Sequence, residues 1–196
     1  MRPGPRGGLS FNRLSVDGDR STNDTALFMA NGAAGNAPLR RGRRGWRRFA
    51  AAAEALCAEL ARQIARDGEG ATKLVVVRVR GAASRRAAEQ VARAVSNSLL
   101  VKTSWFGADP NWGRVLCAAG YSGAAFDPAR VSIAYNGLEA VRGGEPTGLD
   151  PARLRDILLR PEFELEIDLH AGRGCYSMTT CDCSEAYVRI NAAYMT

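Results

Sequence analysis

The sequence has little lysine, little histidine and no long apolar run. Among 196 residues, lysine occurs only at Lys73 and Lys102, and histidine only at His170. One histidine and five irregularly spaced cysteines give neither the ligand spacing of a zinc site nor a disulfide framework, so we expect a surface histidine and buried free thiols. No apolar stretch approaches the roughly 20 residues of a membrane-spanning helix. The first ten residues, MRPGPRGGLS, lack the apolar core of a secretory signal. We therefore expect a cytoplasmic protein with no metal, no cofactor and no membrane partner.

Other function classes lack their motifs as well. There is no GxSxG elbow, no P-loop and no glycine-rich nucleotide fingerprint after an expected strand. The formal net charge is +7, and six arginines within residues 40–48 account for most of that excess. No DNA- or RNA-binding motif surrounds them, so we interpret this Arg40–Arg48 cluster as a solvated loop before a helix. A basic nucleic-acid-binding protein is the weaker alternative.

Apolar periodicity predicts a mixture of helices and strands without a repeat. Helices are expected at residues 46–66, 85–97 with Ser84 as N-cap, 112–119, and 151–159 with Asp150 as N-cap. Strands are expected at residues 73–80, 99–103, 131–135, 138–141, 162–169 and 187–194. Such mixing indicates an α/β (α+β) fold in which helices cover a sheet.

A dense polar stretch lies within residues 11–36, FNRLSVDGDRSTNDTALFMANGAAGN. Asp, Ser, Thr and Asn fill most of residues 17–25, and these residue types bond nearby backbone groups and favour turns. Leu14 and Val16 precede the polar residues and the apolar residues 26–30 follow them, so we expect a loop between two buried segments. Such a loop is either a solvated connector or the wall of a small-ligand site, and its flanks favour the second.

Four motifs, in order, resemble the ornithine acetyltransferase (glutamate N-acetyltransferase) family of arginine biosynthesis. They are the polar stretch, RDGEGATK at residues 66–73, LVKTSWFGADPNWGRVLCAAGYSG at residues 100–123, and the final YVRINAAYMT. We interpret residues 11–196 as one β-chain-like domain that follows a flexible leader, residues 1–10. The resemblance implies a four-layer α/β/β/α sandwich, of which this chain would supply about half.

The resemblance also implies substrate-binding residues. It gives this role to Glu69 in GEGATK, to Asn191 in the IN dipeptide and to the final Thr196. A carboxylate at Glu69 can receive the ammonium of ornithine through charge-assisted hydrogen bonds. From the residues alone, DGEG after a helix favours a helix C-cap and turn. INAAYMT could be a frayed tail, but the expected alternating strand so close to the end argues against fraying. The motif at residues 100–123 is expected to pack beneath the site.

Family enzymes cut themselves before a threonine, which then carries the acetyl group. Only MRPGPRGGLS precedes the first motif here, and it holds no threonine, so we assign no catalytic residue and expect the chain alone to be inactive. The implied reaction moves an acetyl group from N-acetylornithine to glutamate, and some members also use acetyl-CoA. The alternative is an inactive fragment or an amino-acid-binding module.

The implied partners are these substrates, the product ornithine, and an α chain of the same enzyme in an oligomer. Five apolar residues are candidates for a surface that the α chain would cover: Phe28, Met29, Val75, Val77 and Leu165.

Overall fold

Two parallel strands, β1 (Leu74–Ala82) and β5 (Glu162–Asp168), lie at the centre of the fold. The structure is a computed structural model that describes residues 10–193. Within these residues one six-stranded mixed sheet forms in the order β4-β3-β2-β5-β1-β6. Its remaining strands pair antiparallel with their neighbours and are β2 (Ser132–Tyr135), β3 (Leu138–Arg142), β4 (Glu145–Pro146) and β6 (Gly174–Cys181).

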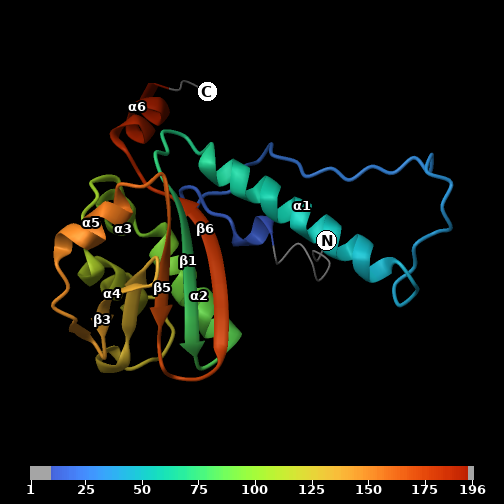
Figure 1. The fold of residues 1–196 in the computed structure, drawn as a ribbon. Helices are drawn as coiled ribbons and strands as arrows, with labels where there is room; N and C mark the ends of the chain where they lie inside the picture. Colours follow the sequence, from blue (N-terminus) through green and yellow to red (C-terminus); the bar gives the residue numbers. More distant parts are fainter. Residues whose placement is uncertain (1–9, 194–196) are drawn as a thin grey trace.

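One face of the sheet is covered by helices and holds the core. Helices α2 (Arg85–Asn97), α3 (Leu99–Phe106) and α4 (Trp112–Gly120) lie behind the sheet in Figure 1, and α2 packs on both β1 and β6. Alternation along each strand turns every second residue toward these helices. Val75 and Val77 of β1 and Leu165 of β5 therefore lie in the core and are fully buried. The expectation that these three residues form an exposed surface is wrong.

The opposite face of the sheet carries paired charges. Arg78 in β1 lies 2.7 Å from Glu164 in β5, and Arg80 lies 3.0 Å from Glu166. In the parallel register of β1 and β5 each of these arginines is paired diagonally, with the glutamate two residues before its direct register partner. These side chains remain partly exposed, so the described residues form two layers, a sheet and its helices. The four-layer sandwich would need a second such pair of layers.

Helix α1 (Trp46–Arg66) runs beside the sheet and touches β6. The segment that precedes α1 in the chain extends along this helix (Figure 1). Figure 1 shows this segment as a blue loop that leaves the sheet, runs past the length of α1 and returns to its start. Three alanines, Ala50, Ala61 and Ala65, form the buried side of α1. The predicted apolar stripe is present but exposed, because Leu56, Leu60 and Ile64 lie away from the sheet.

Several predicted elements are confirmed at their caps. The side chain of Ser84 accepts a hydrogen bond from the amide of Ala87 at the start of α2, and Asp150 caps α5 (Pro151–Leu158) in the same way. Asn136 and Gly137 both have positive φ in the turn between β2 and β3, as the two-residue hairpin predicted. The α/β class is thus confirmed.

Two predicted strands are helices, and two strands, β4 and β6, were missed. Residues 99–103 begin α3, because the Ser98 side chain accepts a hydrogen bond from the amide of Val101 and caps a helix. Residues 187–194 were expected as the last strand, but Glu185–Ala193 is helix α6. The last strand of residues 10–193 is instead β6, whose sequence GCYSMTTC is too polar to stand out as apolar alternation. No helix within residues 10–193 is long and apolar enough for a membrane span.

Candidate functional site

The RDGEGATK turn connects the end of α1 to the start of β1 and lies against α6. The amide of Asp67 donates to the carbonyl of Gln63 as a helix C-cap, and the amide of Ala71 donates to Gly68 at 2.9 Å. Gly70 has φ +66°, and a Cβ at this position would lie 2.5 Å from the amide nitrogen of Tyr187. Only glycine permits this approach. The turn is therefore both a helix cap and a surface for the last helix.

Glu69 and Asn191, two of the three expected substrate-binding residues, contact each other. Nδ2 of Asn191 donates to Oε2 of Glu69 at 2.7 Å and to the Tyr187 carbonyl at 3.0 Å. Both side chains are exposed. A carboxylate has several lone pairs, so Glu69 can hold the asparagine and still accept an ammonium group. The third residue, Thr196, lies outside the described residues.

The first part of the polar stretch also reaches α6. The hydroxyl of Tyr187 donates to Oδ2 of Asp17 at 3.1 Å. Burial, then this hydrogen bond and the charges of Asp17 and Asp19, raise the pKa of Tyr187 to about 12. Tyr187 precedes Asn191 by one helical turn, so α6 presents two polar side chains to two different segments. Asp17 therefore places carboxylate charge close to the candidate site.

The second part of the polar stretch does not form a wall of that site. Leu27, Phe28 and Met29 are 71–81% exposed. The expectation that residues 26–30 form a buried segment is wrong, because within residues 10–193 the sheet and its helices already close their own core without them. Phe28 has an edge contact with the Phe49 ring of α1. The exposure expected for Phe28 and Met29 is confirmed.

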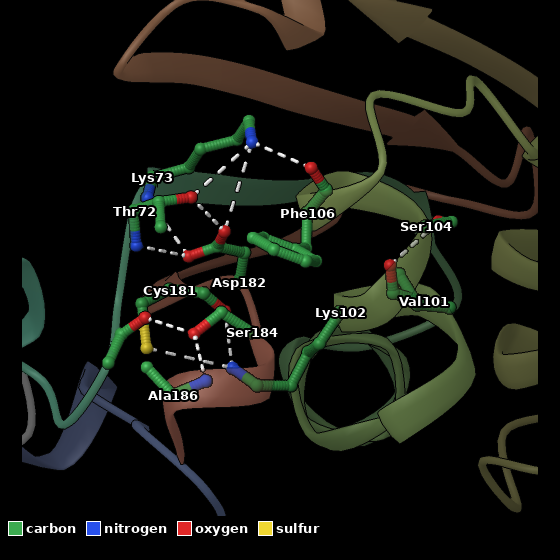
Figure 2. Close-up of polar contacts among 11 residues, drawn as sticks. Thr72, Lys73, Val101, Lys102, Ser104, Phe106, Cys181, Asp182, Ser184 and Ala186 are labelled. Atoms are coloured by element: carbon green, nitrogen blue, oxygen red, sulfur yellow. Dashed lines mark hydrogen bonds and ion pairs between the residues drawn. The ribbon is translucent and has the colours of Figure 1, made fainter. Parts of the chain in front are cut away.

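Asp182 lies buried directly behind the RDGEGATK turn, as Figure 2 shows. One carboxylate oxygen accepts hydrogen bonds from the amides of Thr72 at 2.8 Å and Lys73 at 2.9 Å, and the other accepts from the Thr72 hydroxyl. The ammonium of Lys73 lies 3.9 Å from the same carboxylate. Ser184 continues this contact, since its hydroxyl donates to the Gly70 carbonyl at 2.6 Å.

Lys102 is buried on the other side of the strand end that carries Asp182. Its ammonium donates to the hydroxyl of Thr180 at 3.1 Å and to the carbonyl of Cys181. Burial lowers the pKa of Lys102, against the attraction of Cys181, Cys183 and Asp182. Burial likewise raises the pKa of the Cys181 thiol. This packing of α3 against residues 180–183 agrees with the supporting role expected for the motif at residues 100–123.

Sequence reasoning missed Asp182, Ser184 and Tyr187 as neighbours of the site. A signal was present, since Ser184 followed by Glu185 in a first helical turn is typical of a helix N-terminus. The alternating apolar residues of YVRINAAY masked that signal. No comparable signal marks Asp182, whose partners lie 109 and 110 residues earlier in the chain.

His170 and the Arg40–Arg48 cluster lie apart from these contacts. The ring of His170 is partly exposed and lies 3.2 Å from the Ser132 hydroxyl. A cavity of about 500 Å³ is lined by residues 41–48, at the opposite end of α1 from Glu69. Among the described residues, no three His, Cys, Asp or Glu side chains gather as metal ligands would.

Comparison with known proteins gives one family. The sequence model of the ArgJ family matches residues 8–196. An arginine biosynthesis bifunctional protein ArgJ from Symbiobacterium thermophilum is 50% identical over 187 residues, and a mitochondrial one from Schizosaccharomyces pombe is 46% identical over 191 residues. The match covers 95% and 94% of this chain, but only 46% and 43% of those relatives.

A solved structure has the same fold. The crystal structure of the arginine biosynthesis bifunctional protein ArgJ from Bacillus halodurans superposes with a TM-score of 0.89 at 44% sequence identity. The superposition covers 94% of this chain and 87% of that chain. The present chain thus spans about half the length of the curated relatives it matches and nearly all of this solved chain.

Proposed function

The chain belongs to the ArgJ family, and we propose that it forms the amino-acid-binding half of an acetyltransferase of arginine biosynthesis. The proposed reaction moves an acetyl group from N-acetylornithine to glutamate and leaves ornithine and N-acetylglutamate. The relatives are named bifunctional, and use of acetyl-CoA as a second donor belongs to the same proposal. These activities are those of the whole enzyme, of which this chain covers less than half.

The contact between Glu69 and Asn191 carries the proposal. These residues lie 122 positions apart, on a turn and on the last helix, and their side chains meet at 2.7 Å. Both are positions that the family resemblance identifies as substrate-binding. A structural contact alone would not require an exposed carboxylate and an exposed amide at the surface. Their exposure leaves polar atoms available to an amino-acid ligand.

Each residue of the site has a defined part in this proposal. Glu69 receives the ammonium group of the amino acid, and Asn191 orients the Glu69 carboxylate and offers its own amide oxygen as an acceptor. Thr196 completes the set as an expected third contact. The acyl-accepting threonine and the oxyanion donors match no position of this chain, so we assign them to the other half of the enzyme.

Exposed apolar side chains support a partner half. Leu56, Leu60 and Ile64 on α1 are 43–59% exposed, and Phe28 and Met29 lie on the adjoining loop. An apolar surface of this kind marks a protein contact. In this proposal the other half of the enzyme covers this apolar surface. Its binding there would also bring the acyl-threonine close to Glu69.

Binding and turnover test separate steps. We expect the purified chain to bind ornithine in titration calorimetry but to transfer no acetyl group. Addition of the segment of the Symbiobacterium relative that this chain does not match should restore transfer. In the restored enzyme Glu69→Ala should weaken substrate binding or turnover by about 2–4 kcal/mol, because it removes a charged hydrogen-bonding partner.

A matched control is Glu145→Ala in β4, since Glu145 is equally exposed but lies at the opposite edge of the sheet. This variant should behave as the unchanged chain does. Turnover by the pure chain alone would contradict the division into two halves. Ornithine binding without restored transfer would favour the amino-acid-binding module. Unchanged kinetics in Glu69→Ala would mean that the turn serves only as a helix cap and does not bind substrate.

A further inference from the structure

We propose that Asp182 is a positioning residue of the amino-acid site, which holds the turn that carries Glu69. This inference rests on the proposed function, because it concerns the same site. Asp182 itself does not reach a ligand, since its side chain is fully buried behind the turn. Its action therefore has to pass through the residues it binds.

The turn has few bonds of its own. Between the end of α1 at Arg66 and the start of β1 at Leu74, one backbone hydrogen bond lies within the turn, from the amide of Ala71 to the carbonyl of Gly68. Within residues 10–193 the amides of Thr72 and Lys73 donate to no backbone carbonyl, so both need a side-chain acceptor. Asp182 Oδ1 supplies both, at 2.8 and 2.9 Å. Without it, two backbone donors would lose their partner at the base of the turn.

Hydrogen bonds run in both directions between residues 72–73 and Asp182, so the two segments are joined by backbone groups as well as by the carboxylate. The amide of Asp182 donates to the carbonyl of Lys73 at 3.2 Å. The other carboxylate oxygen of Asp182 accepts from the Thr72 hydroxyl, and the Lys73 ammonium lies 3.9 Å away. Charge-assisted bonds of this kind are stronger than neutral ones, and in a buried site they are little screened by water. The base of the turn is thereby fixed to the end of β6.

The same segment then leads directly to Asn191. Ser184 binds the Gly70 carbonyl, accepts from the amide of Ala186 at 3.2 Å, and so begins α6 against the turn. Figure 2 shows Thr72, Lys73 and Asp182 in one group of contacts and Ser184 in a neighbouring group that includes Ala186. Glu69 and Asn191 thus stand on two segments joined by Asp182 and Ser184. A shift of the turn of about 1 Å would break the 2.7 Å contact between them.

The test uses ornithine binding by the full 196-residue chain, measured by titration calorimetry. Asp182→Asn keeps the shape but removes the charge and one acceptor. We expect affinity for ornithine to fall about tenfold. The matched control is Asp168→Asn, because Asp168 is also buried at the end of a strand and accepts a backbone amide, that of His170, at 3.0 Å. Urea unfolding should show that both variants lose stability, but only Asp182→Asn should lose affinity.

A double-mutant cycle distinguishes positioning from general damage. In a Glu69→Gln background, Asp182→Asn should cost less than about twofold in affinity, since its effect passes through Glu69. A full tenfold loss in that background would overturn the proposal, as would equal affinity losses in Asp182→Asn and Asp168→Asn. If Asp182→Asn does not fold, Thr72→Val removes only the hydroxyl contact and should weaken binding about threefold. No effect of Thr72→Val in that case would also overturn it.

Failure of the proposed function has a different outcome. A wild-type chain that binds neither ornithine nor N-acetylornithine at millimolar concentration would contradict the amino-acid site itself. A wild-type chain that binds, is weakened by Glu69→Gln and is indifferent to Asp182→Asn would leave the site in place and overturn only the role of Asp182.

Discussion

Leu165 in β5 and Leu60 in α1 are the same side chain in opposite surroundings. Leu165 is fully buried between the sheet and its helices, whereas Leu60 is 43% exposed on a helix whose buried side is made of alanines. The same contrast holds for the regions around them. Residues 74–181 enclose most of their apolar side chains, with exceptions such as Leu99 and Leu159 at 60–63% exposed, whereas residues 26–66 expose several of theirs. The first region closes its own core, and the second exposes an apolar surface, which we propose is covered by a partner.

The largest effect should come from shortening the two leucines in turn. Leu165→Ala should lower the free energy of unfolding by about 2–5 kcal/mol, because it removes core contacts and leaves a cavity. Leu60→Ala should change it by less than about 0.5 kcal/mol, as a surface substitution does. Urea denaturation followed by circular dichroism measures both. Equal losses would mean that α1 is buried in solution and that the contrast between the regions is absent.

A smaller effect should appear in self-association. We expect the chain made alone to form oligomers or to dissolve poorly, because α1 and residues 27–29 expose apolar area. Leu56→Gln combined with Leu60→Gln should raise the dissociation constant of such oligomers about tenfold or more. The reason is that full burial of one leucine side chain contributes about 1.5–3 kcal/mol, and both contributions would be lost. Sedimentation velocity at several concentrations measures this.

The control for that change is Glu59→Gln, which alters a neighbouring exposed residue of α1 without changing apolar area. It should leave association as it was. A stable monomer at every concentration, cooperatively unfolding, would show a self-sufficient chain and favour the independent amino-acid-binding module.

The sequence predicted local elements in both regions better than it predicted which surfaces stay exposed, for a physical reason. Ser84, Asp150 and the Asn136-Gly137 turn act on their own neighbours in the chain, so local rules found α2, α5 and the β2–β3 hairpin. The exposure of residues 26–30 depends on which surfaces remain uncovered after folding. No local pattern contains that information.

Alternation misled where a cap was overlooked. Residues 187–193 alternate like a strand, but they belong to α6, which begins just after Ser184, whose hydroxyl accepts a hydrogen bond from the amide of Ala186. For the candidate site, the motifs predicted Glu69 and Asn191, which stays a prediction, and the structure adds that the two side chains touch. Asp182 was not predicted because its partners, Thr72 and Lys73, are brought to it only by the pairing of β1 with β6.

The smallest expected effect concerns the contact between Asp17 and Tyr187, which holds the chain to α6 before the exposed residues 26–66 begin. The hydroxyl of Tyr187 titrates in the folded chain with a pKa of about 12, above the ordinary 10.0, chiefly because of burial and then because of Asp17. Between these two values the unfolded chain binds fewer protons than the folded chain, so this tyrosine's contribution to stability is present below pH 10.0 and is lost as the pH rises toward about 12. Asp17→Asn should lower the pKa of Tyr187 toward the ordinary value while burial keeps part of the shift.

Phenolate absorbance of the wild type minus that of Tyr187→Phe isolates this one titration, and Asp24→Asn is the control. Asp24 belongs to the same loop but bonds only locally, through its amide to the Ser21 hydroxyl at 3.0 Å, so its substitution should leave the pKa of Tyr187 unchanged. A response to Asp17→Asn but not to Asp24→Asn would place the start of the exposed region after Asp17, with the loop held to α6 up to that residue and open beyond it. An unchanged pKa in Asp17→Asn would contradict that contact. The exposed region would then begin earlier, and the carboxylate of Asp17 would no longer belong beside Glu69.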